Sequence, residues 1–209
     1  MNRLFAFVRR RQLLSGLVAL IVIALAVLIV AVIANAPQTS AVRVAACVES
    51  TAGDCIRFPS VTGTNLLGEV FVLPDGFTGD YNLILLSFDE GQTARMAAWL
   101  PVARELAADH PRFAFYSLPA LKSVNPLVRA AIVGGMIVLI PDESVRALTI
   151  MLFLEDKDAF LAALAIETLD APQALLLNPS GEIVWRATGD YSDSAAHDLR
   201  RAVEDFLRP

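Results

Sequence analysis

The chain has 209 residues, of which 56% are hydrophobic, and a formal net charge of −5. This length fits one domain, or one domain with an appendage. Of the 17 Lys and Arg residues, four precede residue 13, whereas all 22 Asp and Glu residues follow residue 34, so residues 35–209 carry 13 basic against 22 acidic side chains, a net charge of −9. Such an acidic domain repels phosphates, which excludes nucleic-acid binding.

Residues 13–34 form a run of 22 residues without a charge. As a helix this run is about 33 Å long, enough to cross a hydrocarbon core of about 30 Å. The next basic residue after it is Arg43, and the basic residues before it are Arg3, Arg9, Arg10 and Arg11. This asymmetry predicts a cytoplasmic segment 1–12, a single-pass anchor in the cell membrane over 13–34, and an extracytoplasmic remainder.

A cleaved signal peptide is the alternative interpretation of this apolar run. The apolar region of a signal peptide spans about 7–15 residues, which is shorter than the run observed here. Cleavage-like patterns end at Ala34 and Ala36, but Pro37 makes the second a poor site. A lipobox-like pattern at 44–47 begins ten residues past the apolar run, too far for lipid attachment. We therefore favour an uncleaved signal anchor.

Cys47 and Cys55 are the only two cysteines, and they lie in a segment, 35–60, that has no periodicity and is predicted to be a tether. Outside the cytoplasm, two cysteines at this spacing predict a structural disulfide, worth about 2–3 kcal/mol in the chain-entropy model. Free or redox-active thiols are the alternative. His110 and His197 lie far from the pair in sequence, so no metal site is predicted. No cofactor motif is apparent either.

The first half of the region 61–209 predicts a strand–helix–strand unit. Strands are expected at Val70–Leu73 and Leu83–Phe88, the second an unbroken apolar run typical of a strand buried on both faces. A helix is expected from about Gln92 to His110, with an apolar stripe formed by Met96, Trp99, Leu100, Ala103 and Leu106. A strand over 112–119 then completes a parallel, right-handed unit.

The second half continues the alternation of strands and helices. The expected elements are a helical segment over 125–142, a strand at Leu148–Glu155, a helix around 158–164, a hairpin of 174–177 and 183–186, and a final helix over about 194–207. This order predicts an α/β fold, a mixed sheet with helices on both faces.

With Pro101 and Pro172 placed as they are, this order resembles the thioredoxin-like superfamily, most closely its peroxiredoxin-like, membrane-anchored branch, which opens with a hairpin such as Gly68 to Pro74. In redox members a Cys-x-x-Cys pair opens the first helix, and a kink proline follows five residues later. Counting back from Pro101 places Thr93 and Met96 at the two cysteine positions. The resemblance also implies a cis bond at Pro172.

The resemblance thus predicts a thioredoxin-like domain over 61–209 that lacks a dithiol active site, and a binding module rather than an enzyme. A second resemblance is to the mitochondrial assembly-factor family of F-type ATP synthase and its bacterial relatives. It is carried by four segments: 88–92, Gly134–Asp142, 156–164 and 181–189. It implies that the partner is a membrane protein complex such as the ATP synthase membrane sector.

The segment Leu127–Ile140 has one charge, Arg129, and is the best candidate surface for a partner or the bilayer. The alternative, which we slightly favour, is an ordinary buried helix. Trp99 is expected in the core because it lies on the apolar stripe. For Trp185 the sequence does not decide which face of the hairpin carries the side chain.

Asp89, Glu90 and Gln92 precede or open the first helix, where acidic side chains can simply cap it. A binding rim formed with Thr93 and Pro172 is the alternative. Two other functions stay open: a thiol-disulfide oxidoreductase that uses Cys47 and Cys55, and a small-ligand site in the degenerate active-site cleft.

Overall fold

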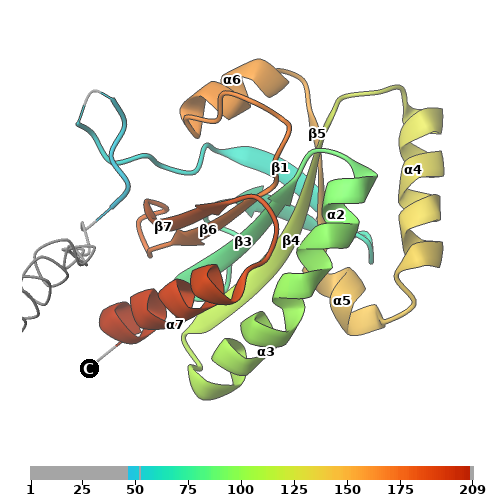
Figure 1. Cartoon of the computed structure of the whole chain (residues 1–209). Helices are drawn as coiled ribbons and strands as arrows, with labels where there is room; N and C mark the ends of the chain where they lie inside the picture. The colour runs from blue at the N-terminus through green and yellow to red at the C-terminus, as the bar shows by residue number, and fades with distance from the viewer. Residues whose placement is uncertain (1–46, 52, 208–209) are drawn as a thin grey trace, which may run out of the picture. The chain divides into compact units, whose positions relative to one another are not determined.

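The computed structural model describes residues 47–51 and 53–207, which belong to one compact unit (Figure 1). The predicted N-terminal segment 1–12, the anchor 13–34 and residues 35–46 of the predicted tether lie outside the described residues. Within the described part of the chain, no helix is long and apolar enough to cross a membrane.

A seven-stranded mixed sheet forms the centre of the domain, in the order β2-β1-β5-β4-β3-β6-β7. The strands are β1 (Val61–Asn65), β2 (Val70–Leu73), β3 (Tyr81–Ser87), β4 (Phe113–Lys122), β5 (Ile150–Leu154), β6 (Gln173–Leu177) and β7 (Ile183–Thr188). The β3–β4 and β4–β5 pairs are parallel, and the remaining pairs are antiparallel. The predicted α/β class with a mixed sheet is confirmed.

Helices cover both faces of the sheet, because side chains of the central strand β3 alternate between two cores. Leu83 and Leu85 face the core closed by α2 (Glu90–Met96), η1 (Ala97–Trp99), α3 (Leu100–Asp109) and α7 (Asp193–Leu207). Ile84 and Leu86 face the core closed by α6 (Lys157–Ala163) and by Phe58. Figure 1 shows α6 on the opposite side of the sheet from α3 and α7.

The helix predicted from Gln92 to His110 is broken into α2, η1 and α3. Pro101 causes the break, because it has no backbone N–H to donate to the Ala97 carbonyl. The Leu100 N–H donates to that carbonyl instead, which tightens one turn into a 3₁₀ helix. The bend leaves Met96 and Trp99 fully buried beneath it.

Two elements were not predicted from the sequence. Strand β1 has the sequence VTGTN, without an apolar run, and its pairing with β2 and β5 makes it a strand.

The predicted helical segment 125–142 is α4 (Pro126–Leu139), capped by Asn125, whose side chain accepts from the Val128 N–H. A further helix, α5 (Glu143–Leu148), begins at Asp142, whose side chain accepts from the Ser144 N–H.

Cys47 and Cys55 form a disulfide, as predicted. The residues around it, which the sequence assigned to the tether, pack against the sheet edge. The Val48 N–H donates to the Ile183 carbonyl at 2.6 Å, and the Phe58 N–H donates to the Gly181 carbonyl at 2.8 Å. Ile56 and Phe58 are buried in the core, so the packed unit begins before the predicted boundary at residue 61.

The expected cis bond at Pro172 is wrong. Among the described residues the cis peptide bond is Leu73–Pro74, so Ala171–Pro172 is trans. Trans is the lower-energy isomer of a prolyl bond by about 0.5–1 kcal/mol, and it prevails unless the surroundings require the other. The Pro172 carbonyl accepts the Gly189 N–H at 2.9 Å, which extends the β6–β7 ladder by one bond.

Candidate functional site

A mainly apolar cavity of about 450 Å³ lies between α2–η1 and the end of α4. One wall comes from α2 and η1, through Thr93, Ala94, Met96 and Ala97. The opposite wall comes from α4 and the connection to α5, through Met136, Leu139, Ile140 and Pro141. Leu85 of β3, Ser117 of β4 and Thr149 lie between the walls. The cavity therefore adjoins both positions at which the resemblance places cysteines in redox relatives.

Thr93 lines this cavity and makes its hydrogen bonds within the chain. Its hydroxyl donates to the Asp89 carbonyl at 2.9 Å, so the Ser87 hydroxyl is the donor in their contact of 2.7 Å. A threonine hydroxyl has no acidity comparable to that of a thiol. Thr93 is thus a positioned polar group in the cavity wall that cannot form a mixed disulfide.

Met96 is 1% exposed and packs in the core with Trp99. Its thioether cannot form a mixed disulfide, and no cysteine lines the cavity. The arrangement therefore offers shape and apolar surface to a ligand, without dithiol chemistry.

The three residues proposed as a binding rim have separate roles. Asp89 caps α2, because its Oδ1 accepts the Gln92 N–H at 2.8 Å. Gln92 is 2% exposed, and its side-chain amide bonds to the Phe88 N–H and the Leu169 carbonyl. Only Glu90 of the three lines the cavity.

Pro172 is not among the residues that line the cavity. Gln92 of α2 bonds to the carbonyl of Leu169, three residues before Pro172 in the same loop. The structure therefore brings Thr93, Met96 and Glu90 to one site and leaves Pro172 outside it.

Trp99 is fully buried, which confirms its predicted place in the core. Trp185 is half-buried and meets the Trp99 ring edge to face, with ring centroids 6.0 Å apart. Both tryptophans therefore report on the packing of η1 against β7.

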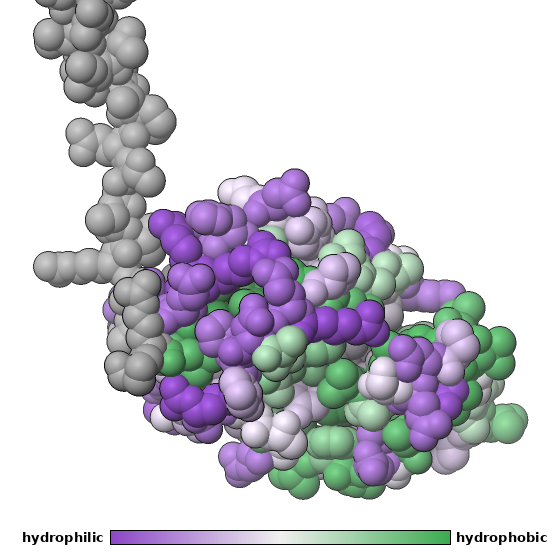
Figure 2. Space-filling view, turned by 90° about the horizontal axis from the view of Figure 1, so that it is seen from below, coloured by the Kyte–Doolittle hydropathy of each residue, from purple (hydrophilic) through white to green (hydrophobic). Residues whose placement is uncertain are grey.

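Helix α4 has no buried residue, so the favoured interpretation of an ordinary buried helix is wrong. Its exposed apolar side chains are Leu127 (82%), Val128 (41%), Ile137 (37%), Val138 (80%) and Leu139 (61%). Figure 2 shows apolar residues gathered at the side of the molecule where α4 lies. A periodic apolar pattern is the same for a buried helix and for a helix with an exposed apolar surface. The sequence alone therefore does not decide between these two interpretations.

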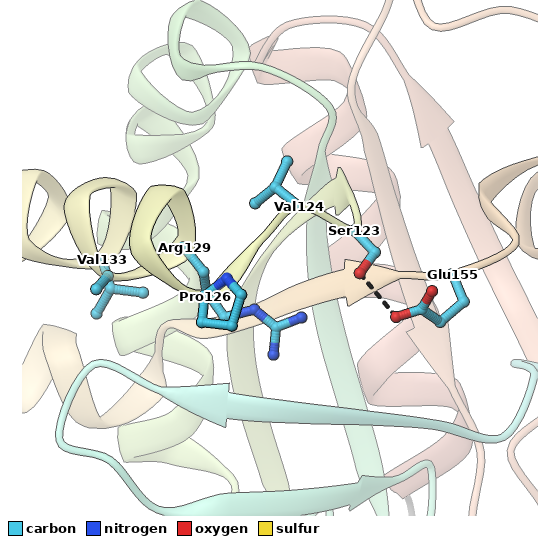
Figure 3. A pocket seen from close by; sticks show the side chains of 7 residues that line it. Ser123, Val124, Pro126, Arg129, Val133 and Glu155 are labelled. Carbon is cyan, nitrogen blue, oxygen red and sulfur yellow. Dashed lines mark hydrogen bonds between the residues drawn. The ribbon is translucent and has the colours of Figure 1, made fainter.

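A second, wider hollow of about 490 Å³ lies at the start of α4 (Figure 3). Its polar groups are already paired: the Ser123 hydroxyl donates to Glu155 Oε1 at 2.7 Å. The Arg129 guanidinium lies 4.6 Å from the centre of the Phe153 ring, a cation–π contact with β5. The one charge of α4 thus holds the helix against the domain.

The mouth of the cavity carries negative charge from Glu90 and Asp142. Hydrogen bonds from Ser144 hold the pKa of Asp142 below its usual value, so this carboxylate stays ionised. Asp142 also lies 3.8 Å from Arg104 of α3. This negative charge disfavours an anionic ligand.

The sequence did not place the α4–α5 residues at this site. Pro141 and Asp142 are the signal that could have done so, because a proline ends a helix and an Asp after it caps a new one. The turn between the two helices brings Met136 and Leu139 over the start of α2–η1.

No family model matches the chain, and no curated protein matches it. Among solved structures, a candidate electron transport protein of Aquifex aeolicus VF5 aligns with a TM-score of 0.51 at 11% identity, over 71% of this chain and 95% of that one. The thioredoxin domain of a thiol-disulfide oxidoreductase from Bacteroides vulgatus gives 0.49 at 20% identity, over 74% and 99% of the two chains. The exposed lipoprotein thioredoxin of Streptococcus pneumoniae TIGR4 gives 0.48 at 13% identity, over 70% and 99%.

Identities this low bear on the fold alone and transfer no activity to this chain. The strand order, the flanking helices and the similarity to the Aquifex aeolicus protein agree on the architecture. The described domain has a thioredoxin-like fold.

Proposed function

We propose that this chain is a membrane-anchored binding module that recognises an apolar segment of a membrane protein complex without dithiol chemistry. The observation that carries the proposal is the apolar cavity of about 450 Å³, in which Thr93 and Met96 stand where redox relatives have cysteines by resemblance. A cavity of this size with few polar groups fits apolar side chains or a small apolar ligand.

The membrane location rests on the sequence of residues 13–34 and on the basic residues before them. In this arrangement the thioredoxin-like domain is extracytoplasmic, where the Cys47–Cys55 disulfide is stable. The resemblance to the ATP synthase assembly-factor family makes the membrane sector of that enzyme the first complex to look for.

A thiol-disulfide oxidoreductase that uses Cys47 and Cys55 is the competing function. Cys47 is 5% exposed and Cys55 is half-buried, and the pair belongs to a segment that is hydrogen-bonded to β7, away from the residues that line the cavity. These features favour a structural disulfide, because a catalytic pair needs an accessible sulfur.

Affinity capture of the full-length chain from mild-detergent membranes tests the proposal, with a Cys47→Ser/Cys55→Ser variant beside it. We expect both proteins to retain the same membrane complex. Captured proteins that disappear with the double variant, or that are held through mixed disulfides, would establish the oxidoreductase and overturn the proposal.

A further inference from the structure

Helix α4 is apolar around its whole circumference. Ile132, Val133, Met136 and Ile140 are half-buried, and at 100° per residue they share the side that faces the domain. Leu127 and Val138, the two most exposed large apolar residues of α4, lie on the opposite side. The only charged residue of the helix, Arg129, contacts Phe153. A helix whose outer side faces water carries polar side chains there, so this outer side requires an apolar environment.

The length and the glycines of α4 limit what that environment is. Fourteen residues make a helix of about 21 Å, too short to cross a bilayer. A Cβ at Gly134 or Gly135 would meet nothing within 4 Å, so neither glycine serves close packing within the domain. The helix thus suits a position parallel to an apolar boundary and not a crossing of it.

The bilayer is the apolar boundary nearest to this domain if residues 13–34 span it. Only the twelve residues 35–46 separate that run from Cys47, and a chain of that length reaches at most about 40 Å. A domain of this size has a radius of gyration of about 15 Å, so its surface stays within reach of the membrane. Tethering of this kind gives α4 a high effective concentration at the lipid surface.

We propose that α4 lies in the interface of the bilayer that anchors the chain, with Leu127 and Val138 among the headgroups and the outer acyl carbons. This inference rests on the proposed function only in taking residues 13–34 as an anchor. It also places the mouth of the cavity, which Met136 and Leu139 help to form, at the membrane surface, where an apolar segment of a membrane protein is accessible.

The charge of the domain determines which lipid headgroups allow α4 to bind the vesicle surface. Residues 35–209 carry a net charge of −9, and the one cation of α4 is held against Phe153. Attraction to anionic headgroups therefore contributes little, and burial of apolar side chains drives the contact. Phosphatidylcholine vesicles should be enough, and neither high salt nor added anionic lipid should strengthen binding.

The test uses the full-length chain reconstituted in phosphatidylcholine vesicles that contain a spin-labelled lipid quencher. Ala131→Cys on α4 and Ala108→Cys on α3 each receive an environment-sensitive fluorophore; both alanines are exposed and helical. Because Cys47 and Cys55 are bonded to each other, the introduced cysteine is the only free thiol. We expect several-fold stronger quenching at residue 131 than at residue 108, and loss of that difference in a Leu127→Glu/Val138→Glu background.

Equally weak quenching at residues 131 and 108 would show that α4 faces water and would overturn the inference. Disulfide crosslinks between two copies of the unlabelled Ala131→Cys chain, together with absence of lipid quenching in the labelled chain, would show that a second copy covers α4 and would also overturn it. In both cases resistance of the chain to alkaline carbonate extraction would show that residues 13–34 still anchor it, so the proposed membrane location would stand. Extraction of the chain by carbonate would show that residues 13–34 do not span the bilayer, and this result would overturn the inference as well.

Discussion

Gln92 joins α2 to the loop before β6: its Nε2 donates to the Leu169 carbonyl at 2.5 Å across 77 residues of sequence. Its Oε1 accepts the Phe88 N–H at 3.0 Å, so one buried side chain satisfies two backbone groups. Together with the Asp89 cap, these bonds fix the start of α2, and with it the position of Thr93 in the cavity wall.

Replacing Gln92 with Met, which has a similar length, should lower the free energy of unfolding by about 1–3 kcal/mol. The reason is that the change leaves the buried Phe88 N–H without a partner, at about that cost, whereas Leu169 is exposed and its carbonyl can bond to water. Urea unfolding of the full-length chain in mild detergent, followed by the fluorescence of Trp99 and Trp185, measures the loss. Glu90→Met on the exposed side of the same helix is the control, and an equal loss in both variants would contradict the account.

Removing the disulfide with Cys47→Ser/Cys55→Ser should lower the free energy of unfolding by about 2–3 kcal/mol, from the entropy of closing so short a loop. The same urea titration measures it. Hydrogen exchange should accelerate first at the Val48 amide, which donates to the Ile183 carbonyl of β7, and at the Ile56 amide, which donates to the Val48 carbonyl within the segment. Unchanged stability together with a changed set of captured proteins would favour a redox role instead.

The segment that contains the disulfide should loosen at acid pH. Hydrogen bonds from Asn178 and the charge of Arg57 hold the pKa of Glu182 below its ordinary value of 4.5. A carboxyl group with a lowered pKa stabilises the fold above the ordinary value, and this contribution is lost as the pH falls through the folded pKa. At neutral pH, hydrogen exchange at the Phe58 amide should therefore be slower in the wild type than in Glu182→Gln. This difference in exchange rate should shrink below about pH 4.5. A difference that persists at pH 3 would contradict this assignment.

Met96→Ala should affect packing but not any thiol activity. Met96 is 1% exposed, and truncation of a buried Met costs about 2–5 kcal/mol. Neither Thr93 nor Met96 carries a thiol. We therefore expect neither the wild type nor the variant to accelerate the reduction of insulin by dithiothreitol above the uncatalysed rate. Turnover by wild type that is lost in the Cys47→Ser/Cys55→Ser variant would contradict the absence of dithiol chemistry.

The sequence predicted those elements whose own residues decide their conformation. The apolar runs at β3 and β6 lie in the middle of the sheet, since a continuous apolar strand needs cover on both faces. The run at β2 also forms a strand, but at the sheet edge, where Val70 and Val72 are exposed. Strand β1 escaped prediction because its neighbours make it a strand, and its own sequence has no apolar run. The isomer of Pro172 was inferred from a resemblance, and nothing in the local sequence requires cis.

The candidate site was only half predictable for the same reason. The spacing from Pro101 located Thr93 and Met96, which lie on the cavity. The opposite wall depends on how α4 folds back over α2 and η1, which is a tertiary property and has no periodic signature. The exposure of Val138 and Leu139 likewise depends on what covers α4, and the sequence gives only the composition of that side.

The central claim, that the cavity binds the partner, is tested most directly by two adjacent substitutions on η1. Ala97 and Ala98 are both exposed, but only Ala97 lines the cavity. Ala97→Phe should fill the cavity and reduce capture of the membrane complex by the full-length chain at least tenfold, whereas Ala98→Phe should capture as wild type does. Equal capture by the two variants would contradict the claim, because it would show that the complex binds elsewhere.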